Sequence, residues 1–108
     1  MDSKSTFCVV IVTCGSSEEA THISKTIVSE KLAACVNVSG PIQSHYIWNG
    51  VLQDDAEYML LIKTQPNCLP ELEKRVKELH SYEVAEFIAL PVIGGSQAYL
   101  SWVAQSVG

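Results

Sequence analysis

Three short segments of the chain are apolar at nearly every position, and this feature limits the possible folds more than any other. They read FCVVIV (residues 7–12), YMLLI (58–62) and FIALPV (87–92). A strand buried on one face alternates apolar and polar residues, whereas a continuous apolar run is typical of a strand that is covered on both faces. We therefore expect a sheet that needs a cover on each of its two faces.

Turn signals divide the chain into short strands. Strands are expected at residues 7–12, 34–38, 42–48, 51–52, 57–63 and 87–92. Gly40-Pro41 and Asp54-Asp55 are expected to interrupt strand structure, and Asn49-Gly50 is the strongest hairpin signal in the chain.

Helices are expected in three places. Ser16 and Glu19 have the spacing of a capping box, and an apolar stripe from Ala20 to Leu32 follows them. A second apolar line covers residues 69–79, and Ser96 can cap a short helix at the C-terminal end.

This order of elements predicts an α+β fold of the ferredoxin-like, split βαβ type. The sheet is mostly antiparallel and carries both long helices on one face, with an inserted hairpin and a short C-terminal helix. A chain of 108 residues has room for one domain, so residues 1–108 are expected to form a single unit in which residues 1–6 are disordered.

The second face of such a sheet has too little of the chain to cover it. Eight to ten apolar side chains left in water would each forgo roughly 1.5 to 3 kcal/mol, and soluble monomers avoid contiguous patches of this kind. We therefore expect a homo-oligomer in which the subunits bury their sheets. The residues expected at the interface are Tyr46, Trp48, Tyr82 and Trp102.

The charge balance argues against a nucleic-acid partner. Twelve acidic residues against seven basic ones give a net charge of −5. The densest basic stretch, Lys74, Arg75 and Lys77, is interleaved with Glu73 and Glu78, as on a solvated helix face. Binding of a phosphate backbone needs clustered Lys and Arg side chains, which this chain lacks. Nucleic-acid binding is therefore excluded as a function.

The N-terminal residues and the cysteines indicate a cytoplasmic protein. The first apolar stretch has only six residues, too few for a secretory signal or a membrane span, so no membrane partner is expected. The cysteines, Cys8, Cys14, Cys35 and Cys68, include no CxxC pair and are interpreted as reduced thiols.

The segment HSYEVAE concentrates polar side chains between the second helix and the last strand. It contains His80, Tyr82, Glu83 and Glu86. One interpretation is a helix end, a turn and a strand start that happen to be polar. The other is a divalent metal site, because an imidazole and carboxylates can bind such an ion if the turn folds back. Both interpretations stay open.

Six motifs in this order resemble those of the CutA divalent-cation tolerance proteins. They are LAACVN (32–37), YIWNG (46–50), the segment 57–64 that begins with Glu57 and ends with LIKT, HSYE (80–83), EFIALP (86–91) and YLSW (99–102). The resemblance extends from about Phe7 to Val103. It implies a homotrimer with an architecture like that of the PII signal-transduction proteins, and it brings no enzymatic reaction with it.

The resemblance also implies divalent metal binding, with copper as the expected ion. The family's proposed ligands match His80 and Glu86, and Glu83 lies between them as a third candidate. A cysteine ligand of some members falls on Val12, so Cys14, two positions further along the strand, is the remaining candidate thiol. Ser81 and Ala85 stand where the family has Pro, usually at the first position and often at the second.

Three other functions fit this fold class. A heavy-metal chaperone requires two cysteines in the first strand–helix loop, where this chain offers only Cys14. An acylphosphatase-like enzyme requires an Arg at that loop, and the sole arginine is Arg75. A trimeric signalling or assembly scaffold, which binds a small ligand or a protein at the subunit clefts, is the alternative that the sequence leaves open.

Overall fold

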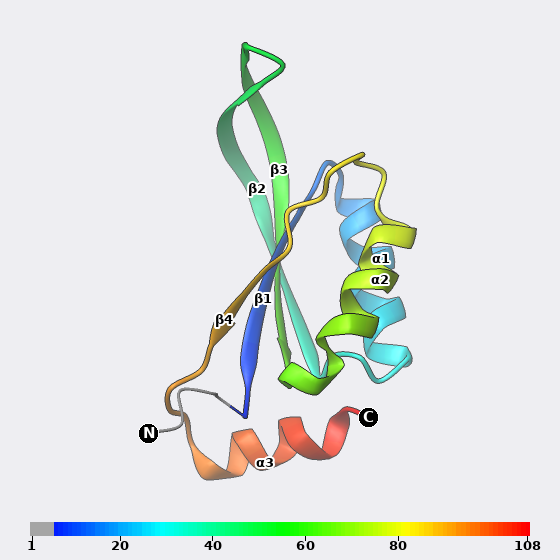
Figure 1. Ribbon diagram of the computed structural model, residues 1–108, viewed down its shortest axis with the longest axis vertical. Coiled ribbons are helices and arrows are strands. Elements are labelled where there is room, and N and C mark those ends of the chain that lie inside the picture. Colours follow the sequence, from blue (N-terminus) through cyan, green and yellow to red (C-terminus); the bar gives the residue numbers. More distant parts are fainter. Residues whose placement is uncertain (1–5) are drawn as a thin grey trace.

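The computed structural model describes residues 6–108 and contains a four-stranded antiparallel sheet with α-helices against one of its faces (Figure 1). The elements in chain order are β1 (Cys8–Cys14), α1 (Ser17–Ser29), β2 (Cys35–Trp48), β3 (Val51–Thr64), the 3-10 turn η1 (Pro66–Cys68), α2 (Leu69–Leu79), β4 (Ile88–Pro91) and α3 (Gln97–Ser106). Disorder was expected for residues 1–6, and all of these except Thr6 lie outside the described range.

The sheet has the strand order β2-β3-β1-β4, which is the order of a split βαβ fold. The predicted α+β class is thus confirmed. Two helix starts are confirmed as well, because Ser16 Oγ accepts a hydrogen bond from the Glu19 amide and Ser96 Oγ accepts one from the Tyr99 amide, each over 3.2 Å.

The core lies between the sheet and the helices α1 and α2, which share one side of it (Figure 1). Alternate strand residues point toward the helices, as the pleat requires. The central buried side chains are Val10, Val12, Leu60 and Ile62 of the sheet, Ile23 and Ile27 of α1, and Leu72 and Val76 of α2.

The two expected strand interruptions are wrong, since β2 and β3 each continue for 14 residues. At Gly40-Pro41 the pairing only shifts register, between Ser39 and Ile42. Glycine suits this position because a Cβ on Gly40 would lie 2.6 Å from Cδ2 of Tyr58.

Asp54 and Asp55 stay within β3 because β2 supplies polar partners for them. Asp54 accepts a hydrogen bond from Gln43 over 2.9 Å and lies 3.5 Å from the imidazole of His45. Cross-strand pairs of this kind support strand structure in polar sequence. The hairpin is therefore the outer part of β2 and β3, which projects beyond the helices, and not a separate insertion (Figure 1).

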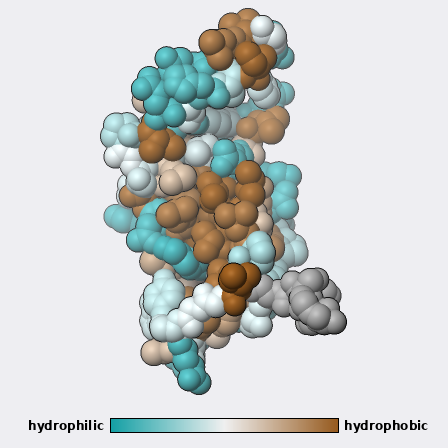
Figure 2. Space-filling model, turned by 90° about the vertical axis from the view of Figure 1, so that its left-hand side faces the viewer, coloured by the Kyte–Doolittle hydropathy of each residue, from teal (hydrophilic) through white to brown (hydrophobic). Residues whose placement is uncertain are grey.

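The opposite face of the sheet is apolar and open. Ile11 of β1 is in register with Leu61 of β3 and with Ile88 of β4, so the three side chains share this face. Ile88 and Leu90 are 49% and 45% exposed. Figure 2 shows the resulting continuous hydrophobic patch on the side away from α1 and α2. We call it the open face.

No helix between residues 6 and 108 combines enough length and apolar character to cross a membrane. The short α3 runs across one end of the sheet and leaves most of the open face uncovered (Figure 1).

Candidate functional site

A cavity of about 750 Å³ lies on the open-face side of the hairpin. Its walls are formed by β2 and β3, by Thr13 at the end of β1, and by residues 82–86. The register places the hairpin residues on one face, since Tyr46 pairs with Gln53 and Ser44 pairs with Asp55. Strand pairing thus builds one wall, and the segment after α2 builds the other.

The two walls are joined by Tyr82 and Glu57. The Tyr82 hydroxyl donates a hydrogen bond to Glu57 Oε2 over 2.8 Å, and Glu57 is only 5% exposed. Burial and this hydrogen bond raise the pKa of the Tyr82 hydroxyl above its ordinary value. Gly15 makes room for the phenol, because a Cβ there would lie 3.0 Å from the Tyr82 hydroxyl oxygen.

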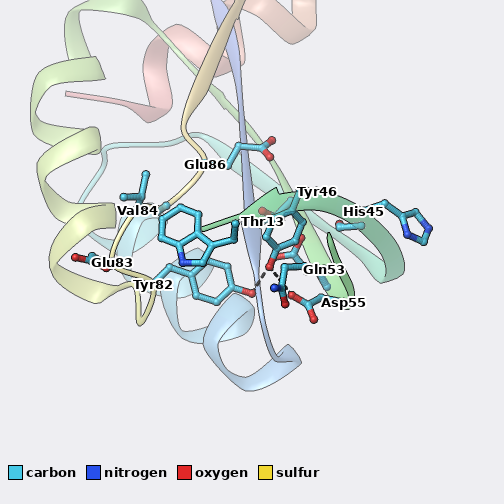
Figure 3. A pocket seen from close by; sticks show the side chains of 13 residues that line it. Thr13, His45, Tyr46, Gln53, Asp55, Tyr82, Glu83, Val84 and Glu86 are labelled. Atoms are coloured by element: carbon cyan, nitrogen blue, oxygen red, sulfur yellow. Dashed lines mark hydrogen bonds between the residues drawn. The ribbon is translucent and has the colours of Figure 1, made fainter. Parts of the chain in front are cut away.

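A second phenol–carboxylate contact lies within the hairpin, where Tyr46 donates to Asp55. This hydrogen bond is the main reason that the pKa of Tyr46 is raised. Figure 3 shows the side chains of Tyr46, Asp55 and Tyr82 directed toward one another, while His45 and Glu83 point away from them.

The cavity is acidic. Asp55, Glu57, Glu83 and Glu86 all line it, and none of the described residues in its wall is Lys or Arg. Partial desolvation and the nearby Glu57 carboxylate raise the pKa of Glu86. Several carboxylates around one cavity, with no Lys or Arg among the described residues of its wall, create a site that favours a cation.

A second group of polar side chains lies beside the cavity. Ligand atoms of Cys14, Glu19 and His80 all lie within 4.8 Å of one another. A thiol, an imidazole and a carboxylate are a ligand set that zinc and copper accept. We call these three residues the thiol–imidazole group.

The imidazole of this group is buried and already bonded on both nitrogens. His80 Nε2 lies 2.7 Å from the Thr13 carbonyl oxygen, and Nδ1 lies 3.0 Å from the Tyr82 amide nitrogen. Since the amide must donate, Nδ1 accepts and Nε2 carries the proton. A metal ion at His80 has to displace one of these two contacts.

The other two members are also held by the fold. The Glu19 carboxylate accepts a hydrogen bond from the Ser81 amide over 2.7 Å, which ties α1 to the segment after α2. Cys14 is fully buried, and burial, with the charges of Glu19 and Glu57, raises the pKa of its thiol to about 12. The thiol must lose this proton before it can bind a metal.

The predicted site residues therefore fall into two places. His80 and Cys14 meet in the thiol–imidazole group, whereas Glu83 and Glu86 lie in the cavity lining. Among residues 6–108, no group of three or more residues whose ligand atoms all lie within 4.8 Å of one another combines His80 with Glu86.

The predicted interface residues also separate. Tyr46, Trp48 and Tyr82 line the cavity, and Trp102 lies in α3, where its ring centroid is 5.6 Å from that of Tyr99.

Two acids at the site were not singled out from the sequence. Glu19 was assigned to the helix start, and Glu57 was the first residue of an apolar strand. The signal for Glu57 was its charge at the beginning of a run that is otherwise apolar, since an acid in such a run needs a partner.

The split βαβ fold, with its long hairpin, its acidic cavity and the adjoining thiol–imidazole group, places the chain in a class of small α+β proteins. The family model described as CutA1 divalent ion tolerance protein matches residues 8–106. The chain belongs to this family.

Relatives and solved structures agree with this assignment. The chain is 44% identical over 100 residues to the divalent-cation tolerance protein CutA of Thermus thermophilus, a match that covers 93% of this chain and 97% of the relative. It is 47% identical over 98 residues to the rice protein named CutA 1, chloroplastic, covering 91% of this chain and 55% of that protein. The crystal structure of CutA1 from rice superposes with a TM-score of 0.94 at 43% identity, covering 99% and 98% of the two chains.

Proposed function

We propose that this chain is the subunit of a non-enzymatic homotrimer that binds divalent cations, copper foremost, and contributes in this way to tolerance of them. The family description names divalent ion tolerance and no reaction. The single observation that supports metal binding best is the convergence of Cys14, Glu19 and His80.

The open face supports the assembly. Ile88 and Leu90 are about half exposed in the single subunit, beside further apolar side chains of β1 and β3. Burial of one such side chain is worth roughly 1.5 to 3 kcal/mol, so contact between copies would gain the free energy that is lost while these side chains are exposed to water. We propose a PII-like trimer, with the projecting hairpin in contact with a neighbouring subunit.

The thiol–imidazole group is the metal site that we propose first. Borderline ions such as copper and zinc favour nitrogen and sulfur ligands over oxygen alone. The ion would take Glu19 through a carboxylate oxygen, His80 in place of one present hydrogen bond, and Cys14 as its thiolate. The cavity carboxylates Glu83 and Glu86, of which Glu86 matches a proposed ligand of the family, are the second candidate site.

Calorimetric titration with copper(II) and with zinc tests this function. We expect Glu19→Gln and Cys14→Ala each to weaken copper binding about tenfold or more. Glu71→Gln is the matched control, because Glu71 is an exposed carboxylate in the first turn of α2. If the wild-type protein binds neither ion, the metal function is wrong. If only Glu83→Gln or Glu86→Gln weakens binding, the ion sits in the cavity instead.

The alternative function is a trimeric signalling or assembly scaffold that binds a small ligand or a protein partner. The cavity supports this alternative, because its volume of about 750 Å³ suits a small molecule. A pull-down from cell extract with and without a chelator separates the two, because a metal-dependent role requires chelator-sensitive capture. We propose the cytoplasm as the compartment, since all four cysteines are free thiols.

A further inference from the structure

Glu57 is a buried carboxylate without a cationic partner. It is 5% exposed, and among residues 6–108 the only hydrogen bond to its side chain comes from the Tyr82 hydroxyl, which is a neutral donor. No Lys, Arg or His nitrogen of this part of the chain lies within 4.0 Å of it. Buried acids are ordinarily paired, because an uncompensated charge in a desolvated position is costly. Glu57 also lines the cavity. A cationic ligand that entered the cavity could therefore form an ion pair with this carboxylate.

The remaining wall is suited to the body of an organic cation. Tyr46, Trp48 and Tyr82 bring aromatic rings to the cavity, and Figure 3 shows Tyr46 and Tyr82 facing it. Aromatic faces attract ammonium and guanidinium groups, because the ring quadrupole places negative charge on the face of the ring. Asp55 adds a further carboxylate at the same wall.

The size of the cavity distinguishes an organic cation from a bare metal ion. Its volume of about 750 Å³ lies within the range of roughly 300 to 1,000 Å³ that is typical of small-molecule sites. A divalent ion is held by oxygen, nitrogen or sulfur ligands at about 2.0 to 2.6 Å, and aromatic walls contribute nothing to it.

A base from a second copy of the chain is a weaker candidate for the occupant. Lys25 lies in α1, and Lys74, Arg75 and Lys77 lie in α2, which cover the other face of the sheet. Lys63 of β3 shares the open face with Leu61, two positions away, but it already donates to Asn37. Copies that meet through their open faces would therefore bring few cations to this cavity.

We propose that the cavity binds a small organic cation, an ammonium or guanidinium group on an aromatic or apolar body, with Glu57 as its counter-ion and Tyr46 and Trp48 as its aromatic wall. This proposal rests on the small-ligand alternative of the proposed function, whose ligand class it names, and it does not depend on divalent metal binding.

Three matched probes test the proposal on the purified full chain at neutral pH with a chelator present. They are benzylamine, which is protonated there, its neutral analogue benzyl alcohol, and the anion phenylacetate. We expect calorimetry to show benzylamine binding about tenfold or more tightly than benzyl alcohol, and phenylacetate not at all. The indole N–H signal of Trp48 in the NMR spectrum should shift on titration with benzylamine.

Variants locate the site. Glu57→Gln should lose about tenfold or more in benzylamine affinity, while Glu71→Gln on α2 should bind as the wild type does. If Glu57→Gln does not fold, Glu86→Gln and Trp48→Leu are measured in its place, and each should weaken binding about threefold or more. Equal binding of benzylamine and benzyl alcohol, unchanged affinity in these variants, or no benzylamine binding would each overturn the proposal. Because the chelator removes divalent ions, none of these results bears on metal binding.

Discussion

The hydroxyl of Tyr82 reaches the buried carboxylate of Glu57 over 2.8 Å and so connects the segment after α2 to the middle of β3. The backbone of the same tyrosine donates to His80, whose other ring nitrogen contacts the Thr13 carbonyl oxygen. Tyr82 therefore links the cavity to the thiol–imidazole group, and changes at this residue should affect both.

Tyr82→Phe should lower the free energy of unfolding by about 1 to 3 kcal/mol, because it leaves Glu57 buried without its only hydrogen bond. Urea denaturation at a fixed protein concentration measures this. The control is Tyr58→Phe, whose hydroxyl makes no hydrogen bond among residues 6–108. Equal stability of the two variants would show that the Tyr82–Glu57 bond contributes nothing.

Gly15→Ala should destabilise the protein by about 1 to 3 kcal/mol, since the new Cβ would press on the Tyr82 hydroxyl from 3.0 Å. Gly94→Ala is the matched control, because a Cβ there meets nothing within 4 Å. Chemical denaturation of both variants gives the comparison. A loss at Gly15 no larger than that at Gly94 would contradict the close approach.

Glu86→Gln should become more stable, relative to the wild type, as the pH rises. The folded state raises the pKa of Glu86 above its ordinary value of 4.5, so the folded protein holds this proton more tightly than the unfolded chain does. The stability gained from the protonated acid is full below that value and is lost as the pH rises through the folded pKa. Denaturation of both proteins between acidic and neutral pH tests the sign, and a difference independent of pH would refute it.

Copper binding at the thiol–imidazole group should release a proton from Cys14 and should strengthen as the pH rises. The pKa of this thiol is raised to about 12, so the proton is present at neutral pH and must leave when sulfur binds the ion. Titration in two buffers of different ionisation enthalpy counts the protons. Cys14→Ala should release fewer, and the same proton count in both proteins would exclude the sulfur as a ligand.

The local signals in the sequence were sufficient for the element types and the helix starts. Ser16 and Ser96 cap their helices because capping needs only residues within one turn. The strand interruption at Asp54-Asp55 was predicted wrongly because Asp54 is kept in β3 by contacts with Gln43 and His45 of the opposite strand. Partners across a strand pair cannot be recognised from a local polar pattern.

Closeness in sequence did not predict the candidate site. His80, Glu83 and Glu86 are near one another in the chain but fall into two places, whereas Cys14, which the family resemblance indicated, meets His80 across the fold. Glu19 and Glu57 were missed because each has a simple local role, at a helix start or a strand start. Their site contacts, to the Ser81 amide and the Tyr82 hydroxyl, cross 62 and 25 positions of the chain.

Ile88→Glu should disrupt the assembly, because it places a charge on the open face, where copies are expected to meet. Val28→Glu is the control, since Val28 is similarly exposed, at 40% against 49%, but lies on α1. Size-exclusion chromatography with light scattering measures the mass of each variant. Assembly that survives Ile88→Glu but fails in Val28→Glu would place the contact on the helical side.

Sedimentation equilibrium of the wild-type protein at low micromolar concentration tests the central claim, that copies of this chain cover the open face for one another. We predict a single species with three times the 11.8 kDa mass of one chain. A stable monomer, with Ile88 and Leu90 left in water, would contradict both the trimer and the function proposed for it.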